Sequence, residues 1–281
     1  MNKQYITPET ILAFDRALLL EERAAGTKEN YLRYLWRFVA FLDGKPASKE
    51  LAAQWKEDLI EQRYNPASIN TMLAAVNRFF RFMGWEDCCV RPLRLQKQLF
   101  REDSRELTRE EYSRLVETAQ ALRKERLALL LEAICATGVR VSEVQYLTVE
   151  AAQARKAVVS LKGKIRTILI PGKLAKKLLK YARKNKIASG EIFLTQSGNR
   201  LSRKQIWAEM KALCKKAGVA ESKVFPHNLR HLFAKLYYRV CRDVAKLADV
   251  LGHSSIETTR IYLISTGAEH ARALNRLGLV V

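Results

Sequence analysis

The sequence predicts a mainly α-helical protein with one small antiparallel sheet, divided into two domains. Apolar residues recur at three- and four-residue intervals along most of the chain, the period of a helix with one buried face. Two runs rich in β-branched residues, 157–161 and 165–170, flank a Lys-Gly-Lys turn as in a hairpin. A length of 281 residues is typical of two domains of about 100–200 residues each.

Four helices are expected in the first domain, residues 1–85. Thr7 can cap the first helix, with Pro8 in its first turn, and residues 26–27 begin the second. Ser48 can cap the third, and residues 65–66 begin the fourth. Each helix has one apolar face, so these faces are expected to form the core of the domain.

Residues 86–106 lose this periodicity and carry Pro92 among alternating charges, so they are expected to form a linker. The second domain, residues 107–281, begins with Thr108 and Glu111, which are spaced as in a capping box. The helices expected after this point span residues 109–121, 124–136, 173–185, 202–216, 227–240, 243–251, 255–264 and 268–277.

Positive charge is concentrated in the second domain. The chain has 50 Lys and Arg against 29 Asp and Glu, a formal net charge of +21. Residues 1–100 hold 15 basic and 12 acidic side chains, so the other 35 and 17, net +18, lie beyond them. Such a field attracts polyanions, and nucleic acid is the expected partner.

Composition excludes several other classes of protein. Hydrophobic residues make up 48% of the chain, too many for a disordered protein. No apolar run approaches the ~20 residues of a transmembrane helix, so no membrane contact is expected. The first residues lack the apolar stretch of a secretory signal, so the expected location is cytoplasmic. The five cysteines include no Cys-x-x-Cys pair, which indicates reduced thiols.

Three short segments place polar residues where they weaken apolar packing. The segment ATGVRVSE puts Arg140 just after a glycine break, and PHNLRH puts His227 and Arg230 on one helix face. The segment LGHSSIETTRIY puts His253 at a helix start and Tyr262 two turns later. The guanidinium groups of arginine bind phosphate oxygens well, so this set of residues suits a phosphodiester. The sequence has no cluster of carboxylates that would indicate a divalent metal site.

These segments, in this order and with a lysine hairpin between the first two, resemble the catalytic boxes of the tyrosine recombinase (phage integrase) superfamily. The nine-residue interval from His253 to Tyr262 agrees with that family, and the four-helix stretch resembles its core-binding domain. The resemblance implies a helical core-binding domain plus an α+β catalytic domain. It implies a site-specific recombinase that acts through a covalent 3′-phosphotyrosine and Holliday-junction strand exchange, in integration, excision, inversion or resolution of DNA.

The resemblance also implies roles for individual residues. Tyr262 would be the nucleophile, and Arg140 and Arg230 would hold the scissile phosphate. His253 would donate a hydrogen bond to a non-bridging oxygen, and His227 would assist as base or hydrogen-bond donor.

Further residues complete the implied site. Glu143 would brace the arginines. Lys162 lies where the family keeps its hairpin lysine, the general acid for the leaving 5′-hydroxyl, although Lys164 could occupy the tip instead. The side chains expected to contact DNA are Lys164, Arg166, Arg203, Lys204 and His231.

The implied partners are double-stranded DNA and other copies of the chain, with four protomers joining two sites and the segment 268–281 exchanged between neighbours. Directionality or accessory DNA-bending factors are further candidates, whereas no metal or cofactor is expected.

Two other classes of protein stay open: a DNA-binding protein that has kept the fold without the chemistry, and a metal-dependent nuclease. His227 and His231 could also form half a zinc site, but no HExxH motif or cysteine pair supports it. The sequence after Tyr262 lacks the Thr-His of many Xer-type resolvases, which weakens a chromosome-dimer-resolution reading.

Overall fold

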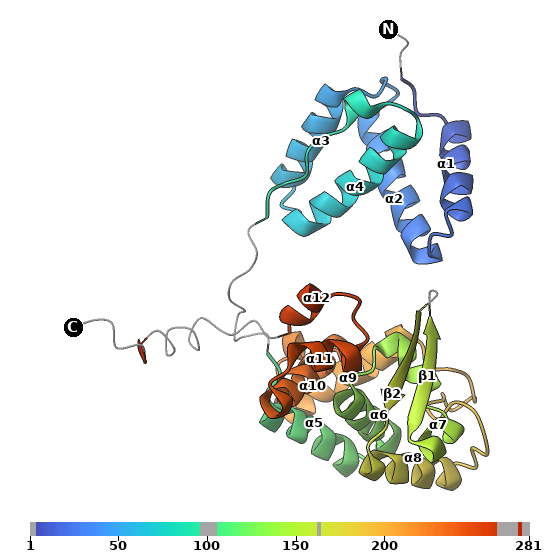
Figure 1. The fold of residues 1–281 in the computed structure, drawn as a ribbon, viewed down its shortest axis with the longest axis vertical. Helices are drawn as coiled ribbons and strands as arrows, with labels where there is room; N and C mark the ends of the chain where they lie inside the picture. Colours follow the sequence, from blue (N-terminus) through green and yellow to red (C-terminus); the bar gives the residue numbers. More distant parts are fainter. Residues whose placement is uncertain (1–3, 96–105, 162–163, 263–274, 277–281) are drawn as a thin grey trace. The chain divides into compact units, whose positions relative to one another are not determined.

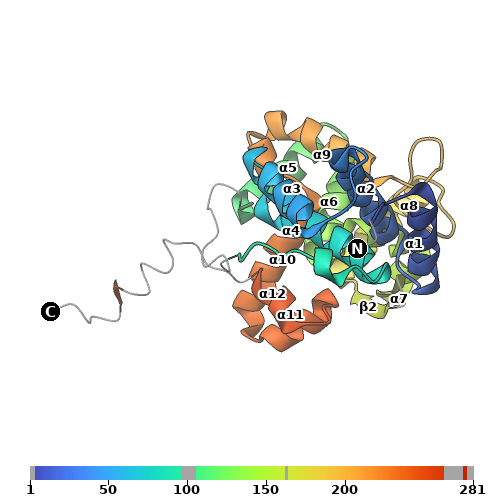
Figure 2. The same cartoon turned by 90° about the horizontal axis from the view of Figure 1, so that it is seen from above.

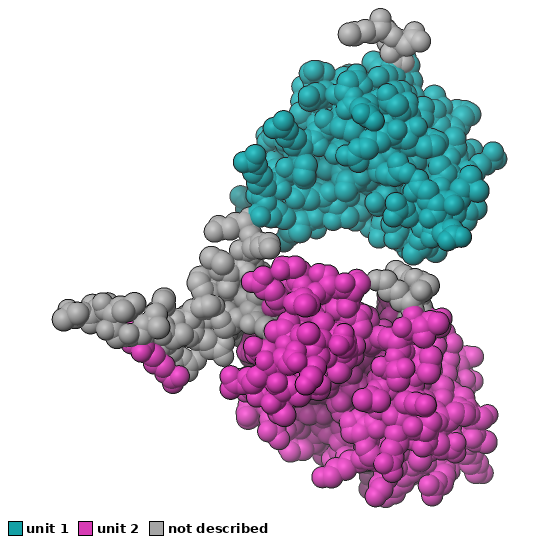
Figure 3. All heavy atoms as spheres, viewed as in Figure 1, with its two compact units in different colours: residues 1–97 teal, residues 98–281 magenta. Residues whose placement is uncertain are grey.

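The structure is a computed structural model of the chain, and it describes residues 4–95, 106–161, 164–262 and 275–276. The chain divides into two compact units, Met1–Lys97 and Gln98–Val281, which Figure 3 shows in different colours. Each unit has its own hydrophobic core. No helix in the described parts of the chain is both long and apolar enough to cross a membrane.

The first unit is a bundle of four helices (Figure 1), as expected: α1 (Pro8–Leu20), α2 (Ala25–Leu42), α3 (Lys49–Glu61) and α4 (Pro66–Phe82). Thr7 and Ser48 cap α1 and α3 through their side chains, because each hydroxyl accepts a hydrogen bond from a free N–H of the first turn. The core is aromatic: the ring centroids of Phe38 and Trp55 lie 5.0 Å apart, and Phe14 and Phe79 meet edge to face.

Part of the segment expected to be a linker packs on this first unit. The short 3₁₀ helix η1 (Glu86–Cys88) follows α4. The Asn77 amide donates to the carbonyl of Val90 at 2.7 Å and accepts from its N–H at 3.0 Å, and Asn70 makes the same pair of bonds with Leu93. Two α4 side chains therefore hold this irregular stretch of backbone in place.

The second unit is built around a buried helix. Its elements, in chain order, are α5 (Arg109–Ala121), α6 (Glu125–Thr137), η3 (Val141–Tyr146), α7 (Val149–Ala154), β1 (Lys156–Leu161), β2 (Lys164–Leu169), α8 (Gly172–Lys184), α9 (Arg203–Ala217), η4 (Glu221–Lys223), α10 (Pro226–Cys241), α11 (Val244–Leu251) and α12 (Ile256–Arg260). The helices α5, α8 and α10 pack on α6, which is apolar on most of its surface. Helix α11 packs on α10, and α12 packs on α11 (Figure 2).

The strands β1 and β2 form the expected antiparallel hairpin, in which Val158 pairs with Thr167. Side chains alternate between its two faces. Ala157, Val159 and Ile168 are buried on the inner face, and Ile165 on the outer face is 77% exposed.

Six of the helices expected in the second unit form within one residue of their expected ends, and the Thr108–Glu111 capping box is confirmed. The helix expected at 255–264 is shorter, because α12 ends at Arg260 and a turn carries Tyr262. The helix expected at 268–277 lies almost wholly outside the described residues. The five cysteines are all free thiols.

Candidate active site

Helix α10 brings Arg230 and His231 into the interior of the second unit, whereas His227 in its first turn is exposed. Pro226 occupies its first turn, where a missing N–H leaves no bond unmade. Arg230 and His231 are almost fully buried, with 1% and 4% of their surface exposed. A buried guanidinium must find acceptors, and its surroundings supply them.

Arg230 is held by two other segments of the chain. Its Nη2 donates to the carbonyl of Leu251 at 2.7 Å and lies 3.0 Å from Nε2 of His253, and its Nη1 donates to the carbonyl of Gly138. Its Nε is buried and has no hydrogen-bond partner among the described residues. Burial and the charge of Arg140 lower the pKa of Arg230 to about 10, so the side chain is still charged at neutral pH.

The carbonyl that accepts from Nη1 of Arg230 belongs to Gly138, a position that requires a glycine. Gly138 ends α6 in the left-handed conformation, with φ of 64°. A Cβ there would lie 2.4 Å from the ring of Phe233 and 3.2 Å from Leu251. The glycine break before Arg140 thus lets the chain turn against α10.

Glu143 links two arginines beneath the surface. It is 3% exposed. The N–H of Arg140 donates to it at 2.8 Å, the Arg140 guanidinium at 2.9 Å, and the Arg166 guanidinium at 2.5 Å. Burial acts to raise the pKa of Glu143, but the Arg140 N–H and the charges of Arg166 and Arg140 outweigh it and hold this pKa below its usual value. The Arg140 side chain stays 39% exposed and can meet a ligand.

Arg166 differs from the expectation that it contacts DNA. Its side chain is only 12% exposed, and besides Glu143 it donates to the carbonyl of Val250 at 3.2 Å. The site is tight at this point, because a Cβ on Gly252 would lie 2.3 Å from Cδ of Arg166. Arg166 therefore ties the hairpin strand β2 to the end of α11.

Tyr262 packs among three imidazole rings. Its ring centroid lies 5.4 Å from that of His227, 5.3 Å from His231 and 5.4 Å from His253, and it is stacked on the last at 21°. Only 5% of Tyr262 is exposed. Nδ1 of His253 lies 2.8 Å from the hydroxyl of Thr259, a residue with no exposed surface.

The structure thus brings together most of the residues that the sequence singled out: Arg140, Glu143, His227, Arg230, His253 and Tyr262. His231 is buried against Tyr262, and Arg203 and Lys204 are exposed at the start of α9. Lys162 and the side chain of Lys164 lie outside what the structure describes. Among the described residues, no three His, Cys, Asp or Glu side chains gather as metal ligands.

Thr259 and Arg166 are the site residues whose place the sequence did not reveal. Thr259 is one of two adjacent threonines, and only its burial separates it from Thr258, which is exposed. The alternation of charged and apolar residues in β2 is the one signal for Arg166, and it does not show which face is buried.

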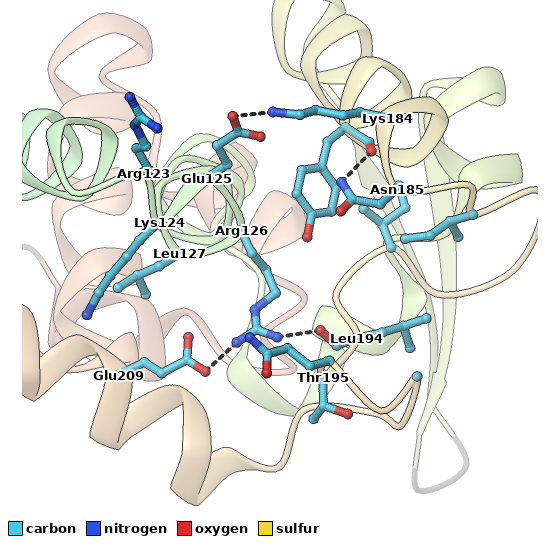
Figure 4. Close-up of a pocket in the computed structure, with 15 residues that line it drawn as sticks. Arg123, Lys124, Glu125, Arg126, Leu127, Lys184, Asn185, Leu194, Thr195 and Glu209 are labelled. Atoms are coloured by element: carbon cyan, nitrogen blue, oxygen red, sulfur yellow. Dashed lines mark hydrogen bonds and ion pairs between the residues drawn. The ribbon is translucent and has the colours of Figure 1, made fainter.

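A separate cavity of about 870 Å³ lies elsewhere on the second unit (Figure 4). It is lined by the start of α6, the end of α8 and the chain near Leu194. Its charged side chains are largely paired: Arg126 with Glu209, and Lys184 with Glu125. None of the predicted site residues lines it.

Known proteins match the whole chain. The model of the phage integrase family matches residues 105–269, and that of the phage integrase N-terminal SAM-like domain matches residues 11–87. Tyrosine recombinase XerA of Pyrococcus furiosus is 29% identical and covers 100% of this chain and 98% of its own. Tyrosine recombinase XerA of Thermococcus kodakarensis is 30% identical and covers 94% and 93%.

Solved structures agree on the fold. A lambda integrase dimer bound to a COC′ core site matches with a TM-score of 0.73 and 17% identity, over 92% of this chain and 77% of that chain. The missing Thr-His after Tyr262 does not separate the chain from relatives that carry the Xer name. The chain belongs to the phage integrase family and is a tyrosine recombinase, an enzyme that cleaves and rejoins DNA.

Proposed function

We propose that this enzyme recombines DNA at specific sites with Tyr262 as its nucleophile. The phenolic oxygen bonds to the scissile phosphorus while the bond from phosphorus to the 5′-oxygen breaks. The products are a 3′-phosphotyrosine and a free 5′-hydroxyl. Attack by the 5′-hydroxyl of another strand reverses the step through a Holliday junction, so the phosphodiester energy is conserved and no nucleotide cofactor is consumed.

The observation that carries this proposal is the convergence of Arg230, on α10, with His253 and Tyr262, which belong to a separate segment. The ring of Tyr262 stacks on that of His253, whose Nε2 lies 3.0 Å from Arg230. A phenol has an ordinary pKa of ~10, so it attacks well at neutral pH only where nearby groups take its proton or stabilise its anion. A buried arginine and neighbouring imidazoles meet that need.

The same site suits the charge of the transition state. The attacked phosphorus becomes pentavalent and its oxygens gain negative charge, which preorganised cations stabilise best. Arg140, exposed beside Glu143, and Arg230, with its unpaired Nε, are the proposed phosphate ligands. Glu143 holds the first in place, His253 donates to a non-bridging oxygen and His227 assists with the proton of Tyr262.

The leaving group needs a proton donor of its own. We assign this role to Lys162, with Lys164 as the alternative, because the sequence puts both at the hairpin turn. A lysine ammonium can protonate the 5′-oxygen as its bond to phosphorus breaks.

Double-stranded DNA and further protomers are the proposed partners. Arg203 and Lys204 are exposed at the start of α9, where basic side chains can meet backbone phosphates. The related lambda integrase is a dimer on a core DNA site. We extend this to a tetramer that joins two sites, assisted where needed by DNA-bending or directionality factors, and we place the enzyme in the cytoplasm of a cell whose DNA it recombines.

A covalent-adduct assay tests the proposal. The substrate is a duplex selected from random DNA for binding to the protein, with a nick beside the cleavage position so that the cut fragment is lost. We expect the wild-type protein to form a protein–DNA adduct in the presence of EDTA, and Tyr262→Phe to bind the duplex normally but form none. Tyr238→Phe, which packs near the same cluster, is the matched control and should still form it.

Three outcomes would contradict the proposal. An adduct in Tyr262→Phe, or one that maps to another residue, would remove Tyr262 as nucleophile. Cleavage that EDTA abolishes would indicate a metal-dependent nuclease, and binding without any cleavage would indicate a DNA-binding protein.

A further inference from the structure

We propose that Thr259 is a positioning residue that lets His253 change from hydrogen-bond acceptor to hydrogen-bond donor when the scissile phosphate binds. The proposal rests on the function above, in which His253 donates to a phosphate oxygen. It concerns a residue that lies against His253 and has no exposed surface of its own.

The hydrogen bonds define which nitrogen of His253 carries the proton. A guanidinium has donors and no acceptor, so Nη2 of Arg230 donates across the 3.0 Å to Nε2 of His253. Nε2 must then present its lone pair. A neutral imidazole has one donor and one acceptor, so the proton is on Nδ1, which donates to the Thr259 hydroxyl at 2.8 Å.

In this state His253 cannot serve the reaction. Its Nε2 has no proton to donate to a phosphate oxygen. Protonating the whole ring is costly here, because burial and the charges of Arg230 and Arg140, with Arg166 and His227 also near, lower the pKa of His253 to about 4. The ring is therefore neutral at neutral pH, and a change of tautomer is the remaining way for Nε2 to become a donor.

Phosphate binding supplies the reason for that change. When Arg230 turns a donor toward a phosphate oxygen, Nε2 loses its donor and faces an acceptor. Nε2 takes a proton from a water molecule at the partly exposed ring, and the hydroxide that remains takes up the proton that leaves Nδ1, so the charge of the ring is unchanged. Nδ1 then needs a donor in place of an acceptor.

Thr259 can fill both roles because a hydroxyl is donor and acceptor and can rotate. In one tautomer its oxygen accepts from Nδ1, and in the other its O–H donates to Nδ1. No part of Thr259 is exposed, so bulk water is not at hand to take its place. A buried nitrogen without a partner would be costly in either state.

Thr259 also joins this switch to the nucleophile. Its carbonyl accepts a hydrogen bond from the N–H of Tyr262 at 3.0 Å, while its hydroxyl contacts His253. One residue thus holds the histidine and the turn that carries the tyrosine.

Three substitutions separate the hydroxyl from the rest of the side chain. Thr259→Val keeps the shape and removes the hydroxyl, Thr259→Ser keeps the hydroxyl, and Thr258→Val is the control at the exposed neighbour. In single-turnover cleavage of the nicked duplex we expect Thr259→Val to be slower by about tenfold or more, as for the loss of one hydrogen bond to a reacting group. We expect Thr259→Ser to stay within about threefold of wild type and Thr258→Val to be unchanged, with DNA affinity preserved in all three.

The tautomer itself can be measured by ¹⁵N NMR of histidine-labelled protein. The chain has four histidines, and His253→Gln assigns the signals of His253. We expect the Nδ1–H form in the free protein. In the complex of Tyr262→Phe with uncut duplex, we expect the Nε2–H form.

Several results would overturn the proposal. They are wild-type cleavage by Thr259→Val, an equal loss of DNA affinity and cleavage in that variant, an imidazolium in the complex, or the same tautomer with and without DNA. The NMR arm needs no Thr259 variant, so it decides even if Thr259→Val does not fold. If His253→Gln cleaves like wild type, or Tyr262→Phe forms an adduct, the proposed function fails and not this inference alone.

Discussion

Single side chains in this site are governed by how deeply they are buried. Arg230 is as buried as the leucines of the core. The carbonyls of Gly138 and Leu251 accept hydrogen bonds from its guanidinium and so offset the cost of burying the charge. Glu143 is likewise a buried charge, and hydrogen bonds from two arginines, Arg140 and Arg166, offset the cost of burying it. The charges of these groups are therefore already at the site without DNA, as the proposed stabilisation of the transition state requires.

The candidate site residues could be picked out from the sequence, but their surroundings could not be predicted from it. Arg140, His227, Arg230, His253 and Tyr262 stand in three recognisable segments. The inward turn of Arg166 and the burial of Thr259 depend on contacts with distant parts of the chain, and no local pattern encodes these contacts.

The lowered pKa of His253 predicts a pH dependence of stability. Burial first, and then the charges of Arg230 and Arg140, lower it from its usual 6.5 to about 4. The unfolded chain therefore binds a proton at a higher pH than the folded one. The contribution of His253 to the free energy of unfolding is fully present above about pH 6.5 and is lost as the pH falls toward 4.

Urea unfolding of wild type and His253→Gln across pH 4–7 measures this contribution. The carboxylates are common to both proteins, so their effects cancel in the difference. We expect the variant to lose less stability than wild type between pH 6.5 and 4. Parallel curves would mean that burial does not disfavour the charged ring.

Among whole elements, length decided what the sequence could predict. The long helices show their 3.6-residue period over three turns or more, and they form where expected. The six-residue α7 was not predicted, because helices this short depend on tertiary contacts rather than on their own pattern. The chain from Glu86 to Leu93 was expected to be a linker because nothing local reveals that Asn77 and Asn70 bind it.

The end of α6 offers a test of crowding at the site. Gly138 and Gly218 both end a helix in the left-handed conformation, with φ of 64° and 62°. A Cβ at Gly138 would meet Phe233 at 2.4 Å, whereas at Gly218 it would meet nothing within 4 Å. We expect Gly218→Ala to cost about 1 kcal/mol from backbone strain, and Gly138→Ala to cost about 1–3 kcal/mol more from overpacking.

Chemical unfolding measures both costs, and the cleavage assay separates their consequences. The carbonyl of Gly138 accepts from Arg230, so Gly138→Ala should also slow cleavage, while Gly218→Ala should not. Equal loss of stability in the two variants would show that Phe233 moves aside without cost.

At the scale of the molecule, net charge is distributed unequally between the two parts of the chain, whereas both parts have apolar residues for a core. The net +18 after residue 100 suits the second unit to a polyanion, whereas the first 100 residues carry net +3. Each unit has a hydrophobic cluster of its own among the described residues. The segment 268–281, which lies almost wholly outside the described residues, carries the apolar residues Leu274, Leu277 and Leu279.

Deleting residues 268–281 tests whether this segment acts between protomers. Burying a leucine is worth about 1.5–3 kcal/mol, so we expect these leucines to be buried, either in their own protomer or on a neighbour. If it packs on a neighbour, the deletion should leave the melting temperature and the binding of a single site nearly unchanged, while complexes that join two sites disappear from native gels and recombination is lost. Because the segment follows Tyr262 closely, its docking would also couple cleavage to assembly. Thermal melts of the truncated protein decide between the alternatives, since a large fall in melting temperature would mean that the segment belongs to the core of its own protomer.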